Sequence, residues 1–221
     1  TRSFPDSVYI KYAREDYFYG ETDSYRNEPY SPVFPIGFDP DIEPGDEIMG
    51  MPWFEKFTLN LCESVLNEES LGQDDHVDLL SISLSAMDWI IHRYGPFSQE
   101  VMDASIKLDK YLGDFISDLD RSIGLEHIEF VLTADHGGLP LPEYERSKSR
   151  ESGRMNREEL NEAYEWVEDE IAEVYTKNLF VRDGTNYFFN MDKLKKRNTP
   201  LSGPASIIKK YLPKVNGIEK V

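Results

Sequence analysis

Apolar residues recur at helical spacing in four stretches of the chain. Ser98 stands before the longest stretch as a candidate N-cap, and Asn156 with Glu159 three residues later resembles a capping box. Pro204 suits the first turn of the last and shortest stretch. The pattern predicts helices over residues 54–72, 98–124, 156–174 and 204–211.

Two short apolar runs, 77–85 and 128–133, flank the second predicted helix and are typical of mostly buried strands. Strand, helix and strand in this order predict a right-handed crossover with parallel strands. Residues 179–181 and 187–189 flank the dipeptide Asp183-Gly184, which favours an antiparallel hairpin. We therefore predict an α/β fold with parallel strands and one small antiparallel hairpin.

The chain divides by composition into three parts. Residues 1–53 are rich in proline, tyrosine and acids without a sustained period, which indicates irregular structure. Residues 54–140 form the α/β core, and residues 141–221 add a loop, a helix, the hairpin and a short helix to the same domain. The chain starts without Met and ends on residues 217–221, which resemble the opening of a strand. We expect it to be part of a longer protein.

The charge balance is strongly acidic. The 221 residues include 24 Lys and Arg against 42 Asp and Glu, a formal net charge of -18. This charge repels phosphate backbones and anionic lipid, which argues against duplex nucleic-acid binding or attachment to a membrane surface. No apolar run approaches the roughly 18 residues of a membrane span. Cys62 is the single cysteine, so no internal disulfide can form.

An Asp and a His follow each predicted strand: Asp88 with His92, and Asp135 with His136. Ligands of parallel sheets bind beyond the carboxyl ends of the strands, where all four residues would meet. Carboxylate oxygen and imidazole nitrogen are ligands that zinc accepts. Each pair alone also has a structural interpretation, in which Asp88 caps a turn and His92 is a hydrogen-bonded, half-buried side chain.

Residues 132–137, Leu-Thr-Ala-Asp-His-Gly, resemble the Thr/Ser-x-Asp-His-Gly motif of the alkaline phosphatase superfamily. The resemblance is to the branch of type I phosphodiesterases and nucleotide pyrophosphatases. In that branch an Asp and a His separated by three residues follow a strand and lead into an aromatic-Gly-Pro sequence, as residues 88–96 do here. The resemblance is strong over residues 68–140 and weak elsewhere.

The resemblance implies an α/β fold in which helices sandwich a mostly parallel sheet, and a site with two zinc ions. Asp88 and His92 would hold the zinc that binds the attacking water or the leaving group. Asp135 and His136 would hold the zinc that binds a Thr or Ser nucleophile, which is transiently phosphorylated. The implied enzyme hydrolyses small phosphoric esters, as a phosphomonoesterase or phosphodiesterase, in the periplasm or outside the cell.

The chain also departs from the family pattern. No segment matches the nucleophile and Asp ligand expected upstream, or the His ligand expected downstream, and Ile91 stands where the family usually has Gly. We therefore expect the chain alone to be inactive, to bind zinc poorly and to self-associate through an open sheet edge. Two alternatives remain open, a degenerate member that acts as a binding module, and a sulfatase or phosphosugar mutase on the same fold.

Overall fold

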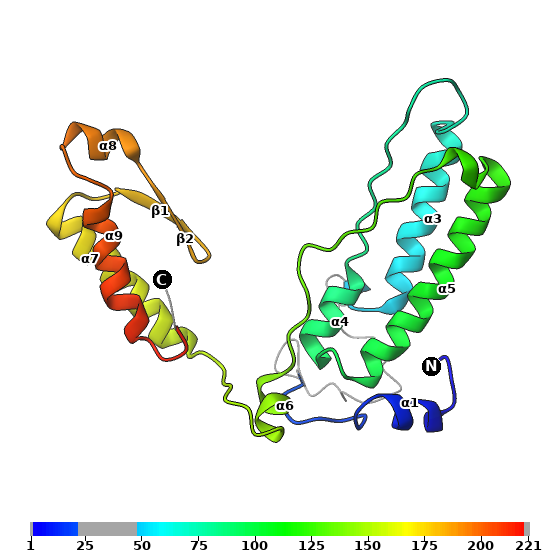
Figure 1. Ribbon diagram of the computed structural model, residues 1–221, viewed down its shortest axis with the longest axis horizontal. Helices are drawn as coiled ribbons and strands as arrows, with labels where there is room; N and C mark the ends of the chain where they lie inside the picture. Colours follow the sequence, from blue (N-terminus) through cyan, green and yellow to red (C-terminus); the bar gives the residue numbers. More distant parts are fainter. Residues whose placement is uncertain (1, 22–47, 219–221) are drawn as a thin grey trace, which may run out of the picture. The chain divides into compact units, whose positions relative to one another are not determined.

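The computed structural model describes residues 2–21 and 48–218 (Figure 1). The chain forms two compact units, Thr1–Arg150 and Glu151–Val221. Both predicted ligand pairs belong to the first unit. None of the helices in the described residues is long and apolar enough to cross a membrane.

The first unit is helical, and its two longest helices lie side by side (Figure 1). Their facing sides bury Leu59, Cys62, Phe115 and Leu119. The cap predicted for the longer helix is confirmed, because the Ser98 hydroxyl accepts the Val101 N–H at 3.1 Å. The helices that the structure describes in this unit include α1 (Asp6–Tyr12), α3 (Pro52–Glu68), α4 (Ala86–Tyr94), α5 (Gln99–Ser122), η1 (Leu125–His127) and α6 (Pro142–Ser147).

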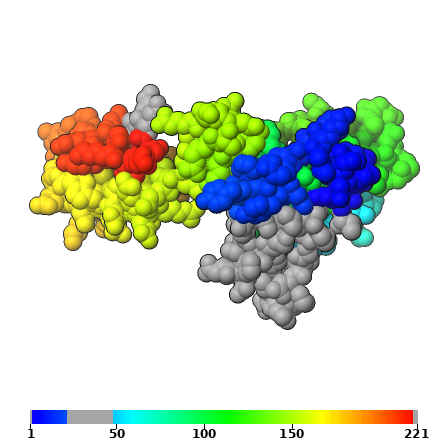
Figure 2. Space-filling model, turned by 90° about the horizontal axis from the view of Figure 1, so that it is seen from below, coloured from blue at the N-terminus to red at the C-terminus, as the bar shows by residue number. Residues whose placement is uncertain are grey.

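Residues 2–21 form a band on the surface of the first unit, blue in Figure 2. The side chain of Tyr9 in α1 is fully buried, and its hydroxyl donates to Asp103 of α5 at 2.5 Å. The backbone N–H of Ser3 donates to the same carboxylate oxygen at 2.7 Å. The prediction of irregular structure is therefore wrong for α1, and its part for residues 22–47 lies outside the described residues.

The predicted strands 77–85 and 128–133 have no strand pairing in the described residues, so the predicted parallel sheet is not seen in this part of the chain. Alternate residues of the first segment do pack on the α3–α5 core, namely Leu80, Ile82 and Leu84. The other side of this first segment is open, since Leu79 is 92% exposed, and in the second segment Leu132 is 94% exposed. A strand is stable only with hydrogen-bonded neighbours, which these segments lack in the described residues.

The second unit has a core of its own, and its predicted elements are confirmed. The Asn156 side chain accepts the N–H groups of Glu158 and Glu159 at the start of α7, as predicted. The hairpin pairs Phe180 with Phe189 in antiparallel register. The elements of this unit are α7 (Arg157–Val174), β1 (Phe180–Asp183), β2 (Asn186–Phe189), α8 (Met191–Lys196), α9 (Ser202–Tyr211) and η2 (Leu212–Lys214).

Candidate metal centre

Asp88 and His92 lie one turn apart on the same face of α4. The Oδ1 atom of Asp88 is 3.4 Å from Nε2 of His92. The two side chains are 46% and 69% exposed, so water and ions reach both of them. The four-residue spacing therefore places the carboxylate and the imidazole next to each other, as the sequence predicted.

His136 approaches this pair from the segment that follows the second extended run. Its Nε2 is 3.7 Å from Oδ1 of Asp88, and its ring centroid is 6.1 Å from that of His92. One ligand atom from each of Asp88, His92 and His136 lies within 4.8 Å of the other two. We call these three residues the donor triad.

Asp135 lies beside the donor triad and is the most exposed of the four predicted ligands, at 85%. Its Oδ1 accepts the backbone N–H of His136 at 3.0 Å, and its Oδ2 is 3.6 Å from Nε2 of that histidine. The structure therefore brings three of the four predicted residues together and leaves Asp135 beside them.

The ring of His136 has a defined orientation. Its Nδ1 is 3.3 Å from the backbone oxygen of Gly137. In the tautomer in which Nδ1 donates to this carbonyl, the neutral ring has its lone pair on Nε2. That lone pair belongs to the atom nearest Asp88.

Ile91 holds the two halves of the site close together. An ideal Cβ added to Gly138 would lie 2.6 Å from Cγ2 of Ile91, so only glycine fits at this position without a shift. Ile91 packs on Gly138, and the donor triad still converges. The sequence had marked Ile91 as a departure but gave no signal that Gly138 is its contact.

Glu55 is a residue of this region that sequence analysis missed. It comes from α3, is 2% exposed, and accepts the N–H groups of Ala86 and Met87 at the start of α4. Burial raises the pKa of the Glu55 carboxyl, and the hydrogen bonds from Ala86 and Met87 oppose that rise. No local pattern could have revealed it, because the contact joins two separate helices.

A second group of buried carboxyls lies at the start of α5. Burial is the main reason that the pKa of Glu100 rises to about 8 and that of Glu21 to about 7. Arg14 is paired with Glu21 and lowers both pKa values, whereas Asp16 raises them. Both oxygens of Glu100 lack a hydrogen-bond partner among the described residues.

The amino-acid sequence matches the family described as type I phosphodiesterase / nucleotide pyrophosphatase over residues 6–207. The chain belongs to this family. The match covers all of the donor triad, Asp135 and the helix α7 of the second unit. The predicted resemblance to the alkaline phosphatase superfamily is thereby confirmed.

Individual alkaline phosphatases are similar to parts of this phosphodiesterase-family chain. Alkaline phosphatase PhoV of Synechococcus elongatus is 41% identical over 98 residues, 44% of this chain and 18% of its own length. Alkaline phosphatase PafA of Elizabethkingia meningoseptica is 35% identical over 86 residues, 39% of this chain and 16% of its own. The alignments thus span less than a fifth of either curated relative.

The fold of this family member is that of part of an alkaline phosphatase. A crystal structure of wild-type alkaline phosphatase PafA superimposes with a TM-score of 0.75 at 21% sequence identity. The superposition covers 100% of this chain and 41% of that chain. The described part of our chain contributes helices and a small antiparallel hairpin to that fold, without a parallel sheet.

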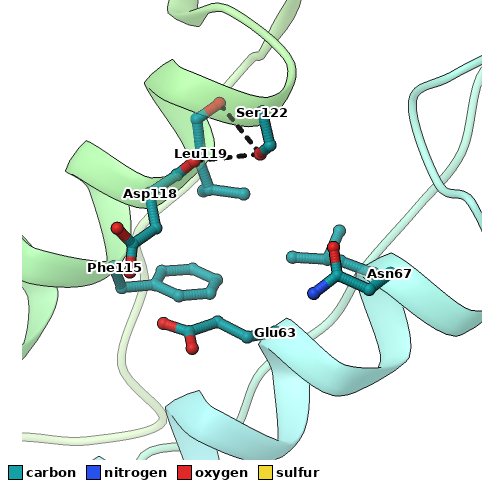
Figure 3. A pocket seen from close by; sticks show the side chains of 7 residues that line it. Glu63, Asn67, Phe115, Asp118, Leu119 and Ser122 are labelled. Atoms are coloured by element: carbon teal, nitrogen blue, oxygen red, sulfur yellow. Dashed lines mark hydrogen bonds between the residues drawn. The ribbon is translucent and has the colours of Figure 1, made fainter.

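An open hollow of about 200 Å³ lies between α3 and α5 and contains no residue of the donor triad (Figure 3). Its floor is apolar and includes the Phe115 ring, and its rim carries the carboxylates of Glu63 and Asp118. The Ser122 hydroxyl donates to backbone oxygens of α5 and is thus engaged within its own helix. The donor triad therefore remains the candidate site of this phosphodiesterase-family chain.

Proposed function

We propose that the complete protein is a metal-dependent hydrolase of phosphoric esters, either a phosphomonoesterase or a phosphodiesterase. The observation that carries the proposal is the convergence of Asp88, His92 and His136 from two separate motifs. Family membership supports the reaction class, and the relatives named alkaline phosphatases support phosphoric esters as substrates.

The donor triad fits zinc by its chemistry. Two imidazole nitrogens and one carboxylate oxygen are borderline ligands of the kind that zinc accepts, and catalytic zinc sites use three protein ligands with one open position. Their exposure leaves room for that open position. We propose that the triad holds one zinc ion in this chain, and that Asp135 joins the four-residue set of a two-zinc site in the complete protein.

When bound, zinc polarises a phosphoryl oxygen and stabilises the negative charge that develops on it. The chain's own residues prepare the site for that role. The Gly137 carbonyl fixes the ring of His136, so that Nε2 is the nitrogen available as a ligand. Asp88 lies beside both imidazoles, where its negative charge would compensate the positive charge of a bound ion. We propose that a Thr or Ser nucleophile comes from another part of the complete protein.

Metal titration of the purified chain tests the site. Co²⁺ reports ligand geometry by its visible absorption, and Zn²⁺ is measured by competition. We expect one Co²⁺ per chain with weak affinity, and loss of binding in Asp88→Asn, His92→Ala and His136→Ala. His127→Ala is the control, because His127 lies in η1 and its ion pair in the described chain is with Glu126, outside the donor triad. Equal binding by His136→Ala and His127→Ala would contradict the proposed site.

Hydrolysis assays of the complete protein test the reaction class. We expect multiple turnovers of an aryl phosphate or a bis-aryl phosphodiester in added zinc, abolished by Asp88→Asn. Turnover of an aryl sulfate alone would favour the sulfatase alternative. Intact metal binding without any turnover would favour the binding module.

The extended segments 77–85 and 128–133 support a further part of this proposal. One side of the first segment packs on helices, and the exposed residues of both leave backbone edges available. We propose that in the complete protein they are strands of a mostly parallel sheet, sandwiched by helices. We also propose a periplasmic or extracellular location, which cell fractionation would test.

A further inference from the structure

The carboxylate of Glu55 joins α3 to the first turn of α4. Its Oε1 accepts the N–H of Ala86 at 2.6 Å and the N–H of Met87 at 3.4 Å. The side chain is almost completely buried, and its Oε2 has no hydrogen-bond partner within the described part of the chain. A buried carboxylate is costly, so its bond to the helix start must offset that cost.

The sequence of α4 does not cap its own N-terminus. Ser85 occupies the N-cap position, but its side chain makes no bond to the helix and instead lies 3.0 Å from the Ser83 hydroxyl. The first backbone bond of the helix, from Trp89 N–H to the Ser85 oxygen, is long at 3.5 Å. Glu55 therefore satisfies two of the backbone donors that have no partner within the helix at its start.

The residue that follows the two capped N–H groups is Asp88, and His92 lies one turn further along the same helix. Any rotation or fraying of the first turn of α4 displaces the Asp88 carboxylate. His136 belongs to a segment beyond α5 that packs on α4 at Ile91, one turn after the capped N–H groups, so fraying of the first turn would not carry His136 with it. The distance between Asp88 and His136, 3.7 Å in the structure, thus depends on how firmly α4 begins.

We infer that Glu55 is a positioning residue of the metal centre, which holds the start of α4 and thereby the geometry of Asp88 relative to His136. This inference rests on the proposed function. The negative charge of Glu55 also suits the positive end of the α4 dipole. A short bond to a charged acceptor is about twice as strong as a neutral one.

Four substitutions separate positioning from stability. Glu55→Ala removes the acceptor, and Glu55→Gln keeps an acceptor oxygen without the charge. Leu59→Ala destabilises the same helix by opening a buried space, without touching α4. Glu68→Gln repeats the charge change at an exposed position in the last turn of α3.

Two measurements are made on the full chain at a temperature where every variant is folded. The first is the Co²⁺ dissociation constant. The second is the hydrogen exchange of the α4 amides, residues 88–92, in the metal-free chain. We expect Glu55→Ala to weaken Co²⁺ binding by about tenfold or more, the usual effect of losing a group that supports a ligand. We expect α4 exchange to rise by at least a similar factor.

The matched variants make the outcome decisive. Glu55→Gln should recover Co²⁺ affinity to within about threefold of the parent chain, while Leu59→Ala and Glu68→Gln should leave it unchanged. Unchanged affinity in folded Glu55→Ala, or an equal loss in Leu59→Ala, would overturn the inference. If the parent chain itself binds no Co²⁺, the proposed one-ion site in this chain fails. The hydrogen-exchange measurement then decides alone. If Glu55→Ala leaves the exchange rates of the α4 amides unchanged, the positioning role is overturned. If it accelerates exchange selectively in α4, the positioning role is supported.

Discussion

The side chain of Ile91 packs so closely on Gly138 that a Cβ at Gly138 would stand 2.6 Å from Cγ2 of the isoleucine. Ile91 immediately precedes His92 on α4, and Gly138 follows His136 by two residues. The contact therefore joins the helix that carries two donors to the segment that carries the third.

This contact predicts that Gly138→Ala weakens metal binding. The added methyl group has to push the 135–138 segment away from α4, which separates His136 from Asp88. We expect Co²⁺ affinity to fall by about tenfold, the effect typical of groups that orient ligands. Gly137→Ala is the matched control, since nothing lies within 4 Å of a Cβ at that position.

A compensating change tests the cause. Ile91→Ala removes the group that the new methyl meets, so the double variant Ile91→Ala, Gly138→Ala should regain most of the affinity. If the losses of affinity in the two single variants simply add in the double variant, the effect of Gly138→Ala does not come from its contact with Ile91.

Removal of His136 should abolish most activity of the complete protein. We expect His136→Ala to reduce phosphoester turnover by more than about 100-fold, because it removes a proposed ligand of the ion that would stabilise the transition state. His127→Ala should change turnover little, because its side chain is exposed and outside the donor triad. Similar losses in both variants would leave the motif without predictive value.

Stability of the first unit should depend on the protonation of Glu100. Its folded-state pKa is about 8, above the ordinary value of 4.5, so folding favours the protonated acid. The stability that this protonation contributes is then fully present below about pH 4.5, and it is lost as the pH rises through about 8. The Glu100 carboxyl also interacts with Asp16, Glu21 and Arg14, so these residues contribute to the pH dependence of stability as well.

Glu100→Gln should flatten this pH dependence and raise stability at pH 9 by at least about 1 kcal/mol. The free energy of unfolding is measured at each pH by urea unfolding, followed through the amide signals of α5. The exposed variant Glu68→Gln is the control. A parallel downward slope in both the parent and Glu100→Gln would assign the effect to other groups.

The stability of the second unit should depend on the N-cap of α7, and loss of this cap should leave the stability of the first unit unchanged. Asn156→Ala removes the side-chain bonds to Glu158 and Glu159 and should destabilise residues 151–221 by about 1 kcal/mol. Asn156→Asp keeps an acceptor and should be nearly neutral. Amide signals of α5 should unfold unchanged in both variants, and a matching shift there would show that the two units unfold together.

The isolated chain should self-associate through its exposed extended segments. Val131 and Leu132 are 84% and 94% exposed and lie on backbone without strand partners. Leu132→Lys should therefore lower the mass observed in sedimentation equilibrium at high concentration. Leu125→Lys on η1 is the control, since it adds the same charge away from these segments.

The sequence allowed prediction of features that depend on near neighbours. Helical spacing located α3, α5, α7 and α9, and the capping residues Ser98 and Asn156 marked two of their starts. The four-residue step from Asp88 to His92 likewise placed both on one helix face. In each case the partners lie within one or two turns of each other, so the pattern carries the information.

Features that depend on distant partners were missed. α1 is held by the bond from Tyr9 to Asp103, and α4 is capped by Glu55 from another helix. The segment 77–85 has the alternation of a strand, yet pairing requires neighbours that the described chain does not supply. Local propensity cannot reveal such contacts, because they exist only once the chain has folded.

Along the sequence His92 precedes α5 and His136 follows it, so the chain between the two histidines contains that entire helix. A zinc ion shared by the two imidazoles would close this loop in the folded chain. Because the unfolded chain does not hold the donor triad together, the ion would favour the folded state by mass action. Zinc would then raise the unfolding temperature of the first unit and slow proteolysis of the 128–141 segment. A chelator would make that segment more susceptible to cleavage.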